Sequence, residues 1–560
     1  MCGLAGWTST GAGAEPGALA PMVEALSHRN GADESLSAVI DRQARRAVVL
    51  AASLCDESSG ISIALDGPLV NAAELRADLV KRGYAFAGES DAEVVLRAYQ
   101  HWDKDVVKHM RGGFALALWD AAKERLMLAR DRFGQKPLYL CAAGSTLYFA
   151  SEMKALVRAP GVTVKVDVDA VGEYLAQRYV RGPRTLLQGV RKLVPGTYAL
   201  WQFGNLRETK YWSAPDGQAS VEQNPADSVD AFIAQLDDAV KLHMASGAGA
   251  LLSGGYDSAA IVALMSRHSK NVATFSAEFA DDKHSELAAA ARLAKHFGTQ
   301  HHEIVLAKRD VLAQLPQLVV ARDAPFCRPA DVALFLLARE AARHVKVALS
   351  GDGGDEILGG YRRHTFLRGL KSGKSKANGL YVIPVADLDA DPTPDAQSSA
   401  LRRILYYEQT GWLADNLLER TDRMGAVAAL EMRTPFLDHR VAEYVSTLPD
   451  AARVRGLSTK WILRKADERL ISDSTVKPRK AGFRIALADL MRGEMRELVA
   501  DHLRGPGCIT RSYYDGAVLD RMLDEHFAVR RNHEETLWTL LNLEIWHRTL
   551  SAIPHSAARG

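Results

Sequence analysis

Two glycine-rich loops hold the side chains best suited to chemistry. The first, "LLSGGYDSAA", lies between an apolar run and a helical pattern and contains Leu252, Ser253, Gly254, Gly255, Asp257 and Ser258. Glycines let the backbone approach an anion closely, and the amides and dipole at a helix start favour negative charge. The loop therefore predicts a phosphate site, with a plain glycine turn as the alternative. It is not a Walker A loop because the sequence has no G-x-x-x-x-G-K-[ST] run, and Asp257 beside a phosphate predicts Mg²⁺.

The second loop, "VALSGDGGDEILGGY", repeats this arrangement further along the chain. It holds Ser350 and Gly351, and it crowds the carboxylates of Asp352, Asp355 and Glu356 into five positions. Such crowding is costly unless a cation or a substrate ammonium lies among the carboxylates, although a solvated acidic turn is the alternative. Because parallel sheets bind ligands at the carboxyl ends of their strands, we expect both loops to face one crevice.

A cysteine directly follows the first methionine, in "MCGLAGW". If the methionine is removed, Cys2 carries a thiol and a free α-amine on one residue. The α-amine is partly unprotonated near neutral pH and can take the proton of the thiol, which would make a nucleophile and base in one residue. Taken alone, a terminal cysteine is more readily explained as an ordinary residue, since single cysteines usually pack rather than react.

Composition limits the class of protein. A chain of 560 residues with 47% hydrophobic and 25% charged residues predicts a globular protein of two or three domains. The net charge of +2 offers no field for nucleic acid or an anionic membrane, so we expect small-molecule partners. Five cysteines without a CxxC pair disfavour a disulfide framework or a structural zinc. Without a long apolar run or a signal-like start, the expected location is the cytoplasm.

The elements that position these residues follow from the hydrophobic periods. Within residues 1–211, runs such as "GISIALDG", "GGFALALWD" and "RLMLARD" predict the strands of a layered sheet domain, with "DAEVVLRAYQHW" as an amphipathic helix. Residues 212–227, rich in Pro, Gly, Ser and Asp, predict a linker. In residues 228–560, apolar runs alternate with helical ones, which predicts a doubly wound parallel sheet followed by a helical C-terminal part.

These segments, together with "LARDRFGQKPLYL", "LEMRTPFLDHRV" and "STKWILRKA", resemble the glutamine-hydrolysing asparagine synthetases nearly from end to end. The resemblance implies a four-layer α/β/β/α glutaminase of the N-terminal-nucleophile type, followed by an ATP-dependent PP-loop synthetase. In the implied reaction, Cys2 releases ammonia from glutamine. The second domain makes an acyl-adenylate from ATP and a carboxylate, by default aspartate, and ammonia then displaces AMP. A homodimer is a further expectation.

The resemblance also implies residue roles. In the glutaminase, Cys2 is the nucleophile, Asp91 receives the glutamine α-amine, and the Gly67 backbone donates to the oxyanion. The implied ligands of ATP and pyrophosphate are Leu252, Ser253, Gly254, Gly255, Asp257, Ser258, Ser350 and Gly351; those of Mg²⁺ are Asp257 and Asp355. Asp352 and Lys460 are implied at the reacting centre, where the point charge of a lysine suits a developing pyrophosphate. By spacing alone, Lys460 reads as a solvated helix residue.

Four positions depart from the family pattern. The usual Asn-Gly pair of the oxyanion hole reads Asp66-Gly67, and an anionic Asp cannot donate a hydrogen bond. The family's "HRGPD" reads "HRNGAD", and its arginine strand reads "ARRAVVL", which leaves Arg46 as the candidate for the glutamine carboxylate. Tyr256 stands where the family tends to have an aliphatic residue. The synthetase half is thus better preserved than the glutaminase half.

Several alternatives stay open beside aspartate amidation. The acceptor can be a sugar, a peptide or a specialised metabolite. A second alternative is a synthetase with a weak glutaminase that uses mainly free ammonia. A lactam-forming synthetase is disfavoured by Cys2, and a phosphoribosyl amidotransferase by "SGGYDS". A non-enzymatic scaffold protein would be expected to lose the phosphate loop, which is intact.

Overall fold

The computed structural model of the chain describes residues 3–9, 19–29, 37–40, 48–52, 54–56, 58–215, 228–279, 287–366, 380–382, 398–473, 478 and 486–553. Cys2 and Arg46 lie outside the described residues, as do residues 216–227 of the expected linker. The chain forms two compact units. The first comprises Met1–Val166, Arg181–Ala214 and Ile553–Gly560, and the second comprises Asp167–Val180 and Pro215–Ala552.

Two antiparallel six-stranded sheets form the centre of the first unit. One has the order β10-β8-β9-β1-β3-β2, built from Val190–Lys192, Tyr139–Ala143, Thr146–Ala150, Ala5–Ser9, Val48–Ala52 and Ser37–Ile40. The other has the order β12-β11-β7-β6-β5-β4, built from Asn205–Lys210, Thr197–Gln202, Arg125–Arg130, Ala115–Asp120, Ile61–Asp66 and Leu54–Asp56. The three apolar runs quoted from the sequence predicted β5, β6 and β7 correctly, whereas β1, β2, β4, β10, β11 and β12 were missed.

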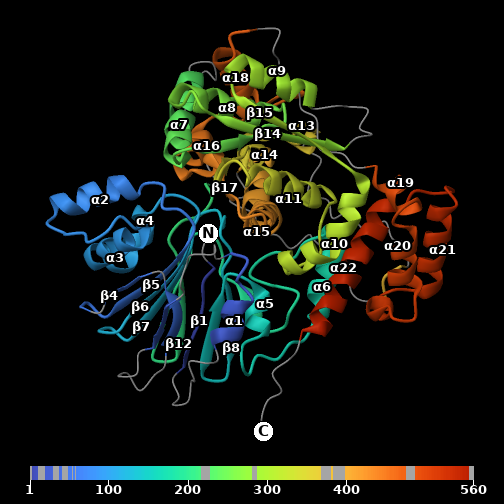
Figure 1. Cartoon of the computed structure of the whole chain (residues 1–560), viewed down its shortest axis with the longest axis horizontal. Coiled ribbons are helices and arrows are strands. Elements are labelled where there is room, and N and C mark those ends of the chain that lie inside the picture. Colours follow the sequence, from blue (N-terminus) through green and yellow to red (C-terminus); the bar gives the residue numbers. More distant parts are fainter. Residues whose placement is uncertain are drawn as a thin grey trace. The chain divides into compact units, whose positions relative to one another are not determined.

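Alternation along the strands places a hydrophobic core on each face of the second sheet. In β6, Ala117 and Trp119 join a cluster with Phe149 of β9, which fills the space between the two sheets. Leu116 and Leu118 point the other way and pack under the helices α2 (Ala72–Lys81) and α3 (Asp91–Trp102). Helices α1 (Ala20–Glu24) and α5 (Met153–Val157) contact the first sheet (Figure 1). This layer order confirms the predicted α/β/β/α arrangement, and α3 matches the predicted helix.

A parallel five-stranded sheet forms the centre of the second unit. Its order is β15-β14-β13-β16-β17, built from Gln300–Leu306, Ala273–Phe279, Gly249–Leu251, Val347–Leu349 and Glu431–Arg433. From β13 the chain winds outward to β14 and β15, then returns to add β16 and β17 on the other side. The strand order reverses between β13 and β16, and ligands of such sheets bind at that point. The predicted doubly wound parallel sheet is confirmed.

Helices surround this sheet and form the C-terminal part of the second unit (Figure 1). Those beside the sheet include α7 (Ser228–His243), α8 (Tyr256–His268), α9 (Leu287–Phe297), α10 (Lys308–Arg322), α11 (Ala330–Ala341), α15 (Glu419–Val427), α16 (His439–Thr447) and α18 (Trp461–Leu470). The C-terminal helices are α19 (Leu487–Arg492), α20 (Arg496–Arg504), α21 (Gly516–Phe527) and α22 (Glu534–Ala552). Helix α6 (Val168–Gln177) belongs to this unit too, since its Tyr174 hydroxyl donates to the Thr539 carbonyl at 3.1 Å. Within the described ranges, we find no helix both long and apolar enough to cross a membrane.

Candidate active sites

The loop between β13 and α8 is held in shape by its own serines. The Ser253 amide donates to the Ser258 hydroxyl at 3.2 Å, and the Gly255 amide donates to the Ser253 hydroxyl at 3.3 Å. The two hydroxyls lie 3.1 Å apart. Gly255 caps α8, so the first helical turn presents its amides and Asp257 at the same edge of the sheet. This geometry suits a phosphate at the helix start.

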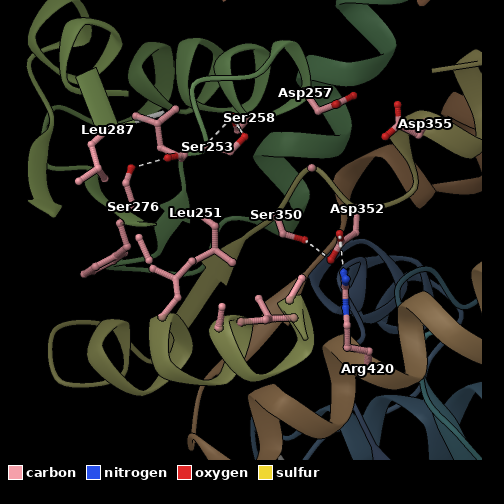
Figure 2. A pocket seen from close by; sticks show the side chains of 18 residues that line it. Leu251, Ser253, Asp257, Ser258, Ser276, Leu287, Ser350, Asp352, Asp355 and Arg420 are labelled. Carbon is pink, nitrogen blue, oxygen red and sulfur yellow. Dashed lines mark hydrogen bonds and ion pairs between the residues drawn. The ribbon is translucent and has the colours of Figure 1, made fainter. Parts of the chain in front are cut away.

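Both glycine-rich loops line one cavity of about 310 Å³ in the second unit. Figure 2 shows that its side chains divide by chemistry: Asp257, Asp352, Asp355 and Arg420 lie on one side, and Leu251 and Leu287 lie away from them. The apolar lining also includes Phe275, Ala277, Ala330, Ala333, Leu334 and Leu337. An apolar end beside a charged, glycine-rich end matches the two halves of a nucleotide, the base and the phosphates.

A buried lysine joins the acidic residues of the two loops. The Lys460 Nζ lies 2.5 Å from both carboxylate oxygens of Asp257 and 2.7 Å from Oδ1 of Asp355. The lysine is only 2% exposed. Burial opposes its charge, but Asp257 and then Asp355 outweigh burial and raise the pKa of the Lys460 ammonium. Lys460 precedes α18 in a left-handed conformation with φ 52°, which turns its side chain back toward α8.

The carboxylates of Asp257 and Asp355 also fit a magnesium ion. Both face the cavity, and their oxygens are the ligands that Mg²⁺ takes together with water and substrate phosphates. Two glycines keep this space open. A Cβ at Gly354 would lie 2.3 Å from Asp257 Oδ1, and a Cβ at Gly360 would lie 1.6 Å from Asp355 Oδ1. A larger side chain at either position would displace a candidate metal ligand.

Asp352 is held by Ser350, which was predicted, and by Thr421 and Arg420, which sequence reasoning missed. Its Oδ2 accepts from the Thr421 hydroxyl at 2.8 Å and from the Ser350 hydroxyl at 3.2 Å, and Arg420 Nη2 lies 3.4 Å from Oδ1. Arg420 also lies 3.7 Å from Asp331 at the start of α11. The sequence gives no signal for Arg420 and Thr421, since they lie on another helix and no motif spacing connects them to Asp352.

Two further polar residues near this site were also missed. Asp467 of α18 is 2% exposed, and among the described residues neither of its carboxylate oxygens has a hydrogen-bond partner. Burial, then the charge of Asp257, raise the pKa of Asp467 well above its ordinary value. Arg464 of the same helix donates to the Tyr256 hydroxyl at 2.5 Å and lies over its ring. Tyr256, the departure from the family pattern, thus ties α18 to α8 beside Asp257.

The buried carboxyl of Glu356 should make the stability of the folded chain depend on pH. It is 1% exposed, and burial, followed by the charge of Asp355, raises its pKa from 4.5 to about 8. Because the folded state holds this proton more tightly than the unfolded state, the stability from Glu356 is fully present below pH 4.5 and is lost as the pH rises through about 8. Glu356→Gln stays neutral and keeps an acceptor for the Tyr361 hydroxyl. The melting temperature of Glu356→Gln minus that of the native chain should therefore be larger at about pH 8 than at about pH 5. A difference independent of pH would contradict this.

In the first unit, Asp66, Gly67 and Asp91 lie around one turn. Asp66 ends β5, and Gly67 follows with φ 104°, a conformation that favours glycine. A Cβ at Gly67 would also lie 2.2 Å from the Gly113 carbonyl oxygen. Asp91 Oδ2 accepts from the Leu69 amide at 3.0 Å, which brings the start of α3 to this turn. The other two expected glutaminase residues, Cys2 and Arg46, lie outside the described residues.

Asp66 belongs to a buried network that also reaches the start of the chain. It is fully buried, and its Oδ2 accepts from Arg29 Nη1 at 3.2 Å and from the Ser151 hydroxyl at 3.0 Å. Lys136 Nζ lies 3.8 Å from its Oδ1. The Ser151 hydroxyl in turn accepts from the Leu4 amide at 3.0 Å. Arg29, Lys136 and the Ser151 hydroxyl thus surround this side chain, and a carboxylate accepts hydrogen bonds and donates none.

Comparisons with known proteins identify the family of both parts of the chain. The asparagine synthase family matches residues 231–548, and the glutamine amidotransferase domain matches residues 1–212. A provisionally named glutamine-hydrolysing asparagine synthetase of Mycobacterium tuberculosis (strain H37Rv) is 32% identical, covering 87% of this chain and 84% of its own. Glutamine-hydrolysing asparagine synthetase 1 of Bacillus subtilis is 29% identical over 87% of this chain and 85% of its own. The amidase chyE of Penicillium rubens is 24% identical over 76% of this chain and 77% of its own. The chain thus belongs to the asparagine synthase family and is an ATP-dependent, glutamine-hydrolysing carbon–nitrogen ligase.

Proposed function

We propose that the second unit activates a carboxylate acceptor as an acyl-adenylate and converts it to an amide, with release of AMP and pyrophosphate. The observation that carries this proposal is the Lys460 ammonium between Asp257 and Asp355 at the charged end of the cavity. A fixed cation there stabilises the negative charge that develops on the leaving pyrophosphate. Ser253, Gly255 and Ser258 bind that pyrophosphate, and the apolar end of the cavity takes the adenine.

Asp257 and Asp355 would hold Mg²⁺, which would neutralise charge on the phosphates. The other proposed roles belong to side chains of the protein. Lys460 keeps its proton throughout because both carboxylates raise its pKa, so it acts as a point charge and not as a base. Asp352 lies at the same end of the cavity with its carboxylate fixed by Thr421 and Arg420. This position suits it to orient the attacking ammonia beside the acyl-adenylate.

In the first unit, we infer that Cys2 attacks the glutamine amide, with its own α-amine as the base. Gly67 donates its amide to the oxyanion, Asp91 receives the glutamine α-amine, and Arg46 binds the glutamine carboxylate. Leu4 is hydrogen-bonded to Ser151, which contacts Asp66, so the chain two residues after Cys2 runs beside this turn. This proximity supports the assignment of the nucleophile.

A second candidate function is a ligase that uses mainly free ammonia. The ion pairs of Asp66 with Arg29 and Lys136 support it, because an ionised carboxylate stands where the family has a donor amide. The default acceptor is aspartate, with a homodimer and a cytoplasmic location as accompanying expectations.

The proposed function is tested by the products of ATP. The full chain is incubated with Mg²⁺, ATP, a panel of carboxylate acceptors and either glutamine or ammonium chloride. We expect acceptor-dependent formation of AMP and pyrophosphate in equal amounts, because the loop with Asp257 is not a Walker A loop. Stoichiometric ADP and phosphate, or no acceptor-dependent ATP cleavage with any carboxylate, would contradict the proposal.

A further inference from the structure

Arg464, in the first turn of α18, restrains the backbone on both sides of Lys460. Its Nε donates to the Thr459 carbonyl at 2.7 Å, and its amide donates to the Lys460 carbonyl at 3.0 Å. These carbonyls belong to the rigid peptide planes before and after the Lys460 α-carbon, so the two bonds together restrain both backbone torsions of the lysine. Lys460 needs this restraint, because its left-handed φ of 52° is unfavourable for a residue with a side chain.

Tyr256 holds the other end of the same guanidinium. Arg464 Nη1 donates to the Tyr256 hydroxyl at 2.5 Å, and the guanidinium carbon lies 4.1 Å from the centre of the tyrosine ring. Tyr256 is the first residue of α8 and directly precedes Asp257. The contact therefore joins the neighbour of Asp257 to the residue that restrains Lys460.

The position of the Lys460 ammonium depends on this backbone geometry. Helix α18 packs beside α8, which brings Lys460 Nζ to 2.5 Å from Asp257 (Figure 1). The lysine side chain is buried, and a Cβ at Gly360 would lie only 2.2 Å from its Cε. The side chain thus has little room to adopt another rotamer, so a shift of the Lys460 backbone would move the ammonium away from Asp257.

We propose that Tyr256 and Arg464 are positioning residues for the adenylation step, which hold the Lys460 ammonium where negative charge develops on the pyrophosphate. The inference rests on the proposed function, which assigns the stabilisation of that charge to Lys460. A cation stabilises a transition state best when it is fixed before the reaction, because no reorganisation is then needed. Tyr256 stands where the family tends to have an aliphatic residue, so the bond to its hydroxyl distinguishes this chain.

Steady-state kinetics of pyrophosphate release test the inference. Tyr256→Leu removes hydroxyl and ring and should lower kcat about tenfold, the effect of one charge-assisted hydrogen bond, whereas Tyr256→Phe keeps the ring and should lower it less. Arg464→Lys keeps the charge but cannot bond Thr459 and Tyr256 together, and a lysine displaced by about 1 Å should cost about 10²-fold in kcat. The KM for ATP should stay unchanged, because the lost interaction belongs to the transition state. Tyr444→Leu, which removes a tyrosine bonded to the Ser228 carbonyl at 3.1 Å between α16 and α7, is the matched control and should leave kcat unchanged.

Binding of magnesium pyrophosphate distinguishes positioning from a purely structural role. Free pyrophosphate carries the charge that develops in the reaction, so its affinity, measured by calorimetry on the full chain, reports on the lysine without turnover. Tyr256→Leu should weaken this binding about threefold in the native chain and not at all in Lys460→Met, because no ammonium is left to position. If Tyr256→Leu does not fold, Tyr256→Phe replaces it in the same comparison.

Two results would overturn the inference. One is a native kcat in Tyr256→Leu or Arg464→Lys, and the other is equal weakening of pyrophosphate binding by Tyr256→Leu with and without the Lys460 ammonium. Absence of acceptor-dependent pyrophosphate release from the native chain would instead overturn the proposed function. The two failures are distinguishable, because the binding comparison needs neither ATP nor an acceptor.

Discussion

Lys460→Met should reduce acceptor-dependent pyrophosphate release about 10³-fold. Methionine fills a similar volume without charge, so Asp257 and Asp355 would face the pyrophosphate with no fixed cation between them. The loss should appear with ammonia and with glutamine alike, because both nitrogen sources need the adenylate. Glutamine hydrolysis should continue, because its residues belong to the other unit. Pyrophosphate release and glutamate formation, measured on one preparation, check both statements.

Two companion variants make this result interpretable. Lys465→Met removes a half-exposed lysine of the same helix that pairs with Glu468, and it should leave both activities unchanged. Asp257→Asn leaves Lys460 paired with Asp355 at 2.7 Å, so it disturbs the buried charges less than Lys460→Met does. It nevertheless removes a proposed magnesium ligand and should also abolish pyrophosphate release. If Lys460→Met releases pyrophosphate at the native rate, the assigned role of the lysine is wrong. Equal loss of both activities with a native melting curve would contradict the separation of the two sites.

The fold of this chain was largely predictable because local periods encode it. Successive side chains of β6 point to opposite faces of the sheet, and both faces are buried. Ser90 caps the start of α3, because its side chain accepts from the Glu93 amide at 3.2 Å. Two of the strands that were missed, β1 and β17, carry weak local signals. β1 (Ala5–Ser9) reads "AGWTS" and β17 (Glu431–Arg433) has three residues, so both depend on pairing with neighbours distant in the sequence.

The contacts within the sites were less predictable. The expectation that two glycine-rich loops meet followed from the edge of a parallel sheet, and the structure brings both to one cavity. The contact between Lys460 and Asp257 joins residues far apart in the chain. The family resemblance implied Lys460 at the reacting centre but did not predict this contact. Arg420 had no signal at all, because its pairing with Asp352 depends on how α15 packs beside the sheet. Buried ion pairs of this kind are a property of the packed fold and not of a motif.

Asp66→Asn should raise the ratio of glutamine-supported to ammonia-supported amide formation. In the native chain, the ionised Asp66 accepts from Arg29 and Ser151 and cannot donate to the oxyanion of the glutamine adduct. Loss of one oxyanion donor typically slows such a step about 10²–10³-fold, so native glutamine hydrolysis should be slow. The asparagine variant keeps an acceptor oxygen for Ser151 and gains an amide that donates. Glutamate formation and pyrophosphate release with each nitrogen source measure the ratio, and Cys2→Ala, which should retain only the ammonia-supported reaction, is the control.

The opposite result has a distinct structural meaning. Asp66 is connected through the Ser151 hydroxyl to the Leu4 amide, and its charge balances Arg29 and Lys136. If Asp66→Asn slows a native glutaminase that is already fast, the carboxylate acts by holding the start of the chain in place, and the oxyanion hole does not include this side chain. Ammonia-supported turnover separates this outcome from misfolding, because it needs an intact second unit and not Cys2. Ser151→Ala breaks the same connection without altering charge, so it should reproduce the slowing only if Asp66 positions the start of the chain.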